Sequence, residues 1–425
     1  MRPGTDPSYR EGMTTLRQAG PGSIEVRPVD GAEIAAFVDT METAWGFDTG
    51  EERRRRAGQN VAGESLLGAF AAGAMAGTAM SYSLELTVPG QVQVPMAGVS
   101  WVAVHPLHRR QGILRALMRS QLDDLHAHAV AMAGLAASEA GIYGRFGYGP
   151  ATWDSSWRLA RGAARHLAGT DHDGRLELVD ARTAGDVLPA VQDQARRSQV
   201  GDVRVYPAWW RSHADEQEAR GRQFVVYRDH EGTAAGYAAY RLEREQRWTS
   251  DATVVVEYLA ACTGAAYRSL WAYLADLDLT GSVEARGRPE HEPLQWALAD
   301  SRQLTVTGVH DHLWIRLVDV GEALSRRRYA AEGSVVLEVA DAFCPWNQRR
   351  WLLEAGPDGA ACRPAPGPGA DGMRLDVSAL GSLFLGGTSV ARLAASGLVE
   401  ADPASLLRAN QMFATGLDPW CSTWF

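Results

Sequence analysis

The arrangement that most constrains this chain occurs twice: a strand, a short turn and an amphipathic helix. In the first copy, residues 99–104 form an apolar, β-branched run that Pro106 must end, because proline cannot donate a hydrogen bond to a strand ladder. Apolar residues then recur at helical spacing from Ile113 to Leu125. Residues 253–277 repeat this order, again after a predicted pair of strands. The repetition predicts an internal duplication of one α/β unit.

The chain is long enough for more than one such unit. Its 425 residues correspond to about three domains of roughly 150 residues each. We expect four segments: a flexible tail rich in Gly, Pro and charge at 1–22, followed by folded units at 23–165, 166–312 and 313–425. Strands and helices alternate throughout, so the predicted fold class is α/β (α+β).

Every one of the 42 basic residues is arginine, because the sequence contains no lysine. This excludes Schiff-base chemistry, a pyridoxal-phosphate anchor and the lysine of a phosphate-binding P-loop. The formal net charge of −9 argues against nonspecific binding to nucleic acid and favours cationic small molecules as partners.

Cysteine and histidine usage and hydropathy exclude further classes. The four cysteines form no CxxC pair, which argues against a disulfide scaffold or a zinc ribbon. The pairs His126-x-His128 and His310-x-His312 lack the spacing and further ligands of a metal site, so we expect no metal. The polar N-terminus and the short apolar runs give no membrane anchor or secretion signal. A cytoplasmic location is therefore expected.

The turn between the first strand and its helix combines charge with a glycine. Arg109 and Arg110 precede Gly112, and the helix begins immediately afterwards. A helix N-terminus presents unpaired N–H groups and a positive dipole end, so such a turn is suited to an anion. We expect it to bind a pyrophosphate, with main-chain N–H groups of Gln111, Ile113 and Leu114 contributing. The matching turn of the second copy, CTGAA, lacks both arginines.

These residues resemble motif A of the GNAT-fold N-acetyltransferases, whose usual pattern is Arg/Gln-x-x-Gly-x-Gly/Ala. Arg109 and Gly112 fit the pattern, whereas Leu114 replaces the last small residue. The loop SEAGIYGRFGYGPAT at 138–152, the later LGSLFLG at 380–386, the duplicated middle unit and the aromatic last residue together resemble the Eis family of bacterial acetyltransferases. The resemblance extends from about residue 24 to 425, and the 138–152 loop is its most specific motif.

The resemblance implies two tandem GNAT-type domains followed by a sterol-carrier-protein-like domain, with acetyl-CoA bound only by the first. It implies that the main chain of Val102, Ala103 and Val104 holds the pantetheine arm and the acetyl group. It also places further residues around the cofactor: Arg109, Arg110, Gln111, Gly112, Ile113, Leu114 and Arg115 near the pyrophosphate, and Ser138 and Glu139 at the end of the next strand.

Acetyl transfer to an amine needs an acid for the departing thiolate and a base for the amine. Tyr143, in the glycine-flanked loop after the second strand, is the candidate acid, and the family has a tyrosine acid at this matching position. Tyr148 in the same loop is the alternative. The resemblance implies that the α-carboxylate of Phe425 is the base, and its ordinary pKa of about 3.5 keeps it ionised at pH 7. Trp424 brings no acidic charge beside it.

The sequence thus predicts an acetyl-CoA-dependent N-acetyltransferase for primary amines of aminoglycoside or polyamine-like molecules, and for lysine side chains of peptides. The family implies a homohexamer. Two alternatives stay open: a lipid-binding or scaffolding protein that uses its C-terminal domain, and an acetyltransferase specific for protein N-termini. The weaker candidates for the substrate pocket are Glu42, Trp45, Phe47, Asp48 and Glu85.

Overall fold

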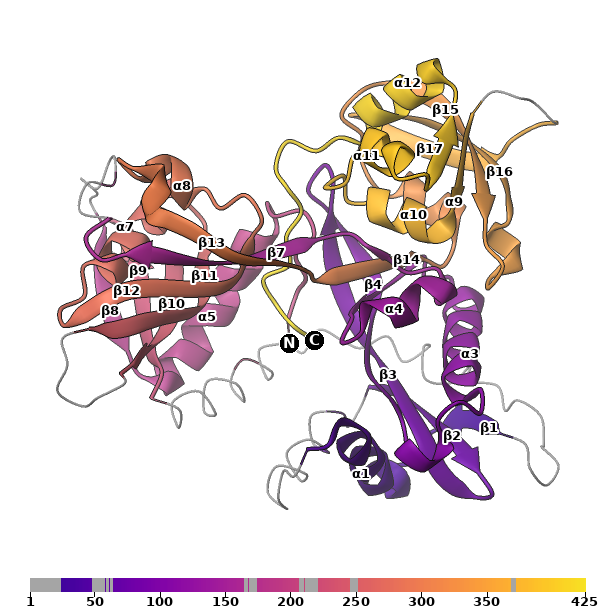
Figure 1. Ribbon diagram of the computed structural model, residues 1–425, viewed down its shortest axis with the longest axis horizontal. Helices are drawn as coiled ribbons and strands as arrows, with labels where there is room; N and C mark the ends of the chain where they lie inside the picture. Colours follow the sequence, from indigo (N-terminus) through magenta and orange to yellow (C-terminus); the bar gives the residue numbers. More distant parts are fainter. Residues whose placement is uncertain are drawn as a thin grey trace.

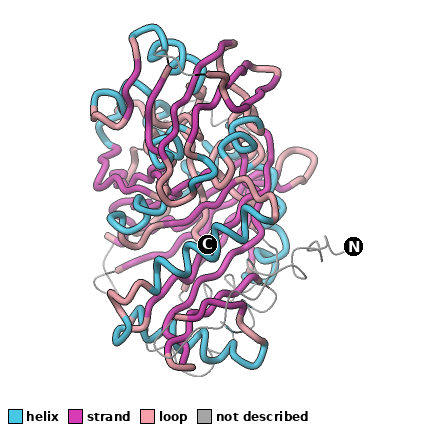
Figure 2. Tube along the Cα trace, turned by 90° about the vertical axis from the view of Figure 1, so that its right-hand side faces the viewer, coloured by secondary structure: helices cyan, strands magenta, loops and turns pink. Residues whose placement is uncertain are grey.

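Three β-sheets with their helices organise the chain (Figure 1). The computed structural model describes residues 24–47, 58, 61, 64–163, 167, 174–205, 210, 221–244, 251–367 and 372–425. The expected tail at 1–22 lies outside these residues. In the view turned by 90° (Figure 2), helices lie across the strands of the sheets.

The first sheet is built mainly from the N-terminal third of the chain. Its strands lie in the order β1 (Glu25–Pro28), β2 (Ser65–Ala71), β3 (Ala74–Val88), β4 (Val92–Val104), β5 (Met132–Ala136), β14 (Leu313–Leu317) and β6 (Gly149–Pro150). Successive residues of a strand face opposite sides of a sheet. Leu66 accordingly packs in the cluster under α1 (Ile34–Trp45), whereas Leu67 packs with α3 (Ile113–Ala127). The two helices therefore cover opposite faces.

The second sheet repeats the first. Its strands lie in the order β13 (Leu304–Asp311), β7 (Trp153–Ala160), β12 (Thr280–Pro289), β11 (Ala252–Ala261), β10 (Ala234–Glu243), β9 (Gln223–Arg228) and β8 (Arg175–Val179). As in β2 to β5, two antiparallel pairs are followed by a parallel pair, here β11 with β12, joined by α7 (Gly264–Ala275). Helix α5 (Ala181–Arg196) packs on the other face. The predicted duplication is thus present in the topology.

The two sheets exchange strands, which the expected boundaries at 165 and 312 did not anticipate. Strand β7 follows the first unit in sequence but pairs with β12 and β13 of the second sheet. Strand β14, expected in the third unit, instead pairs with β5 and β6 of the first sheet. Apolar patterning marks both segments as strands but does not encode which sheet edge accepts them. The segments 149–160 and 304–317 therefore run side by side from one sheet into the other.

The third unit packs directly on the first. Its sheet has the order β17 (Gly359–Pro364), β16 (Arg349–Gly356), β15 (Gly333–Ala340), β18 (Met373–Asp376) and β19 (Val399–Ala401). Buried residues of this sheet belong to one apolar cluster with residues of β3 and β4 such as Leu86 and Met96. The helices of the unit are α9 (Val320–Ser325), α10 (Val377–Leu383), α11 (Val390–Ala395) and α12 (Pro403–Phe413).

Short helices complete the three units. They are α4 (Ala140–Tyr143) and α8 (Leu294–Ala297), with the 3-10 turns η2 (Gly31–Glu33), η3 (Pro106–His108), η4 (Gly144–Phe146), η5 (Ser301–Gln303) and η6 (Pro345–Asn347). After α12 the chain returns between the first and second units, so that the C-terminus lies near the middle of the molecule (Figure 1).

Candidate active site

The first sheet opens between its two parallel strands. Within the described part of the chain, β4 and β5 pair at Ala97 with Ala133 and at Gly98 with Gly134, although β4 continues to Val104. Trp101 has a φ of +51°, and the register with β3 shifts at the same place. A bulge of this kind bends the strand. The main chain of residues 102–104 therefore leaves β5 and borders an opening.

The basic turn lies at the end of this opening strand. Gly112 adopts a φ of +84° and precedes α3, whose N-terminus carries no side-chain cap. Arg110 also has a positive φ, of +62°. A Cβ at Gly112 would meet nothing within 4 Å, so the space in front of the helix is open. Left-handed residues beside an uncapped helix N-terminus make a concave set of N–H groups that suits a phosphate.

The structure gathers the predicted cofactor residues around the opening and the turn. The side chains of Arg109, Arg110, Gln111 and Arg115 are exposed, and Ser138 and Glu139 are exposed just after β5. Val102, Val104 and Leu114 are half-buried, and Ala103 is buried. Ile113 is 1 % exposed and packs beneath Gly77 in the apolar cluster with Leu117, so only its main chain can serve the turn.

Tyr143 lies on the other side of the opening, in α4. Its side chain is buried in the apolar cluster that includes Ala97 and Val99 of β4 and Leu135 of β5. Burial, with the nearby Glu139 carboxylate, raises the pKa of Tyr143 to about 12. The phenol is therefore protonated at neutral pH and can act only as a proton donor there.

Tyr148, the alternative acid, is enclosed more completely. Its ring meets that of Tyr143 edge-on at 6.1 Å between centroids, but its side chain is 0 % exposed. Burial raises the pKa of Tyr148 further than that of Tyr143. Its hydroxyl has no hydrogen-bond partner within the described ranges. This enclosure favours a packing role for Tyr148.

The C-terminal segment is anchored on the second unit. Asp202 accepts hydrogen bonds from the Ser422 N–H at 2.9 Å and from its hydroxyl at 3.0 Å. The Trp420 N–H donates to the Val200 carbonyl at 2.9 Å, and the indole Nε1 donates to the Gly287 carbonyl at 3.0 Å. These bonds fix the chain in the five residues before its end.

The last side chain reaches the opening between the strands. A Cβ at Gly98 would lie 3.1 Å from Cδ2 of the Phe425 ring, so the ring packs on β4 at the last residue that pairs with β5. Phe425 is half-buried against the cluster shared by the first and third units. The ring thus lies where β4 begins to part from β5, on the face of β4 opposite to Ala97 and Val99, which share a cluster with Tyr143.

Known protein families match three successive segments of the chain. Residues 25–151 and 202–317 each match an acetyltransferase (GNAT) domain family, and residues 320–422 match a sterol carrier protein domain. An uncharacterized N-acetyltransferase of Streptomyces coelicolor is 39 % identical over 82 % of this chain and 85 % of its own length. The N-acetyltransferase Eis of Mycobacterium tuberculosis is 35 % identical over 78 % of this chain and 81 % of its own length.

The structural comparison agrees. The crystal structure of Eis1 from Mycobacterium abscessus has a TM-score of 0.83 and 34 % identity, over 94 % of this chain and 100 % of that chain. The chain belongs to the Eis family of N-acetyltransferases. A GCN5-related N-acetyltransferase from Anabaena variabilis, 20 % identical over 95 % of this chain and 100 % of its own, shares the fold at a TM-score of 0.81. The predicted family, fold class and acetyltransferase activity are thus confirmed.

The two GNAT units of this Eis-family chain differ at the turn before the helix. In the second unit, the Thr263 side chain accepts a hydrogen bond from the Ala266 N–H at 3.1 Å and caps α7. The first unit has Gly112 at the equivalent place and no side-chain cap. The N-terminus of helix α7 is therefore capped by a side chain of the protein, whereas the N-terminus of helix α3 is open.

The weaker substrate-pocket candidates fall in different places. Trp45 and Phe47, at the end of α1, are 45 % and 49 % exposed and meet edge-on at 5.8 Å. Glu42 is buried, whereas Asp48 lies outside the described residues. Glu85 forms an ion pair with Arg196 of the second unit at 2.6 Å. The aromatic pair and Glu85, whose side chain is 38 % exposed, are thus the described members of this set that can meet a ligand.

Several buried polar groups of this Eis-family enzyme were not anticipated. Arg316 of β14 is 0 % exposed, lies beside Tyr148 and pairs with Asp341 of the third unit at 2.7 Å. Asp202 is 3 % exposed. In the sequence, both residues resemble ordinary surface or turn residues, because their partners are remote. A charged residue inside the buried run of β14, LWIRL, is the one signal that could have indicated Arg316.

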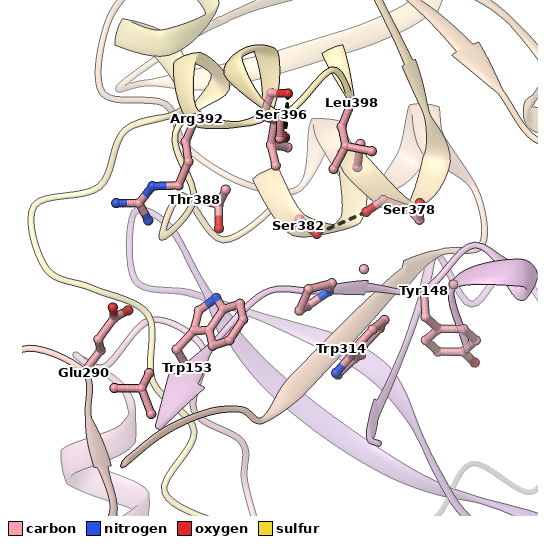
Figure 3. A pocket seen from close by; sticks show the side chains of 16 residues that line it. Tyr148, Trp153, Glu290, Trp314, Ser378, Ser382, Thr388, Arg392, Ser396 and Leu398 are labelled. Carbon is pink, nitrogen blue, oxygen red and sulfur yellow. Dashed lines mark hydrogen bonds between the residues drawn. The ribbon is translucent and has the colours of Figure 1, made fainter. Parts of the chain in front are cut away.

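A cavity of about 500 Å³ lies between the third unit and the crossing strands (Figure 3). Its lining comes from α10 and α11 on one side and from β6, β14 and Trp153 on the other. Arg392 and Glu290 stand toward one end, and Tyr148 lies toward the other.

Two features are absent from the described residues. His, Cys, Asp and Glu side chains there form no group of three that could hold a metal ion. His126 instead stacks on Trp346, with ring centroids 4.3 Å apart. No helix in the same residues is long and apolar enough to cross a membrane.

Proposed function

We propose that this enzyme transfers the acetyl group of acetyl-CoA to primary amines of aminoglycoside or polyamine-like molecules and to lysine side chains of peptides. One observation supports the proposal most: Tyr143, the uncapped turn before α3 and the ring of Phe425 all border the place where β4 leaves β5. In this proposal the acid, the anion site and the base meet where the two strands part, with Tyr143 and Phe425 on opposite faces of β4.

The chain offers a complete set of contacts for acetyl-CoA, the substrate of GNAT acetyltransferases. The main-chain N–H groups at Gln111 to Leu114 and the exposed arginines of the turn would hold its pyrophosphate. The main chain of Val102 to Val104 would hold its pantetheine arm and offer N–H groups to the developing oxyanion. Ser138 and Glu139 lie at the end of β5, where they would contact the same molecule.

Proton transfer would use the two remaining groups. A primary amine has an ordinary pKa near 10, so it binds mainly as a cation and must lose a proton before it attacks. The ionised carboxylate of Phe425 attracts the cation and accepts this proton. The amine nitrogen then bonds to the thioester carbon, which gives a tetrahedral intermediate with a positively charged nitrogen. As the carbon–sulfur bond breaks, Tyr143 donates its proton to the departing thiolate, and the proton that the nitrogen loses on forming the amide restores the phenol.

The test measures free thiol released from acetyl-CoA with an aminoglycoside, a polyamine and a lysine peptide. Appending one alanine after Phe425 moves the carboxylate away from the opening but leaves Asp202 and Trp420 in place, so turnover is expected to fall at least 100-fold. Appending an alanine to the N-terminus is the matched control and leaves turnover unchanged. Wild-type turnover in the C-terminally extended enzyme would refute the role of the carboxylate.

The same set of acceptor amines distinguishes this proposal from an acetyltransferase that is specific for protein N-termini. Net charge −9 and the exposed pair Trp45 and Phe47 favour cationic acceptors with an extended surface. An enzyme specific for protein N-termini would turn over a peptide with a free α-amine and no lysine, and would ignore the polyamine. We expect this enzyme to turn over the polyamine and to ignore the lysine-free peptide.

A second function, binding of an apolar ligand, is supported by the cavity between α10, α11 and β14. Its volume of about 500 Å³ falls in the range of small-molecule sites. Titration with a fluorescent fatty acid tests this function. Saturable binding that Leu393→Trp abolishes would support it, and the absence of binding would leave acetyl transfer as the single proposed function.

The proposal includes the homohexamer that the family implies. Strand β13 forms an edge of the second sheet and exposes Val306 and Val309 by 51 % and 45 %. Exposed apolar edges of this kind favour association. Sedimentation velocity tests the assembly, and Val306→Lys is expected to shift it toward smaller species.

A further inference from the structure

A buried histidine lies directly under the end of the chain. His312 is 2 % exposed, and its Nδ1 lies 2.8 Å from Oδ2 of Asp154, which is 5 % exposed. The imidazole stacks on the indole of Trp424, with ring centroids 4.4 Å apart and an angle of 26° between the planes. Trp424 is the residue immediately before Phe425.

The pair occupies the point where the two sheets exchange strands. Asp154 lies on β7, and His312 connects β13 with β14. Main-chain bonds keep these segments together: the His312 N–H donates to the Thr152 carbonyl at 3.0 Å, and the Leu313 carbonyl accepts from the Ala151 N–H at 2.8 Å. The Thr152 hydroxyl adds a bond from the Leu313 N–H at 3.0 Å. Sheet continuity therefore does not depend on either side chain.

A buried carboxylate and imidazole lose hydration that their mutual attraction recovers only in part. The imidazole provides a flat surface on which the Trp424 indole stacks. The opposite face of the indole is open to solvent, since Trp424 is 56 % exposed. The nearest anchor before it is Ser422 on Asp202. Three residues follow that anchor, and the first of them, Thr423, is 2 % exposed. Without the stack, the last two would be held only by the Phe425 ring on β4, and the carboxylate would be spread over more positions.

We propose that His312, oriented by Asp154, is a positioning residue that holds Trp424 and thereby keeps the terminal carboxylate at the opening between β4 and β5. This inference rests on the proposed role of Phe425 as base. Neither side chain touches the reacting atoms in this scheme, so loss of the stack lowers kcat and leaves the KM for acetyl-CoA unchanged.

The position of the tail can be measured without the reaction. Carboxypeptidase A removes aromatic residues from accessible C-termini, and mass spectrometry follows the release of Phe425 and Trp424. We expect His312→Ala to accelerate release about 10-fold and to lower kcat by a similar factor, as the loss of one aromatic contact implies. His230→Ala, a histidine with 71 % side-chain exposure in the second unit, is the matched control.

Conservative replacement separates positioning from a chemical role of the ring. The double variant Asp154→Asn/His312→Phe keeps the stack and removes the contact between imidazole and carboxylate, so it is expected to recover most of the lost kcat and protection. A double variant as impaired as His312→Ala would overturn the proposal. If His312→Ala does not fold, Trp424→Ala removes the same stack from the exposed side, and unchanged release of Phe425 from it would also overturn the proposal.

The two proposals fail in different ways. If the carboxylate is not the base, the C-terminally extended enzyme keeps its turnover, and His312→Ala still accelerates release of Phe425. If the extended enzyme is inactive but His312→Ala neither frees the tail nor lowers kcat, the base stands and the positioning role is wrong.

Discussion

Asp202 gives the docking of the C-terminal segment a pH dependence that can be measured as stability. The side chain is 3 % exposed, and burial raises its pKa from 3.8 to about 6, although hydrogen bonds from Ser422 and Val203 oppose this rise. Between these two values the folded protein binds a proton that the unfolded chain does not. Stability from this group therefore increases as the pH falls from 7 through 6 toward 4.

The magnitude follows from the difference between the two pKa values. One pKa unit corresponds to about 1.4 kcal/mol, so Asp202 adds about 2.5 kcal/mol to the free energy of unfolding at pH 4 relative to pH 7.5. Asp202→Asn keeps an amide that can serve both Ser422 groups but does not titrate. Urea denaturation of both proteins across this range isolates the contribution, because the other carboxylates are common to both.

The control is Asp186→Asn, which changes an exposed carboxylate on α5 of the same unit. This variant removes one carboxylate charge and leaves the hydrogen bonds between Asp202 and Ser422 in place. Parallel stability curves for wild type and Asp202→Asn from pH 4 to pH 7.5 would refute the assignment of a raised pKa to Asp202, and with it the account of this anchor.

Three further changes test other parts of the structure. Tyr143→Phe removes the proton donor and is expected to lower kcat about 10²- to 10⁴-fold, while calorimetry still shows acetyl-CoA binding; an unchanged kcat would exclude Tyr143 as the acid. Arg316→Met leaves the Asp341 carboxylate buried and unpaired, so thermal unfolding should show a loss of about 3–5 kcal/mol, and Arg316→Met/Asp341→Leu should recover part of it. Arg110→Ala should raise the KM for acetyl-CoA about 10-fold and leave the KM for the amine unchanged; a KM for acetyl-CoA equal to that of the wild type would show that the Arg110 side chain does not hold the cofactor.

Local structure was well predicted because its signals are local. Helix α12, for example, begins directly after Asp402, whose side chain accepts hydrogen bonds from the N–H groups of Ala404 and Ser405. The helix predicted from Ile113 begins at that residue, since Gly112 supplies the left-handed turn before it. The repetition of strand, turn and helix likewise gave the shared topology of the first two sheets.

Long-range pairing was not predictable from the same signals. Alternating apolar residues mark β7 and β14 as strands, but the partner of each strand is set by the open edges of two similar sheets. The ion pair of Arg316 with Asp341 and the contacts of Asp202 with Ser422 join residues from different units. A single sequence carries no record of such partners, so the anchors of the C-terminal segment emerged only in three dimensions.

The exchanged strands also set the order in which this protein can be completed during synthesis. Strand β5 pairs with β14, which lies about 180 residues later in the chain. At roughly 5–20 residues per second, a ribosome needs about 10 to 35 seconds to produce that partner. Throughout this interval the nascent first sheet has an unfilled edge at Met132–Ala136, a segment that can pair with another nascent chain. Chaperone binding to this edge during synthesis is therefore expected to affect the yield of folded protein more than the final stability of either unit does.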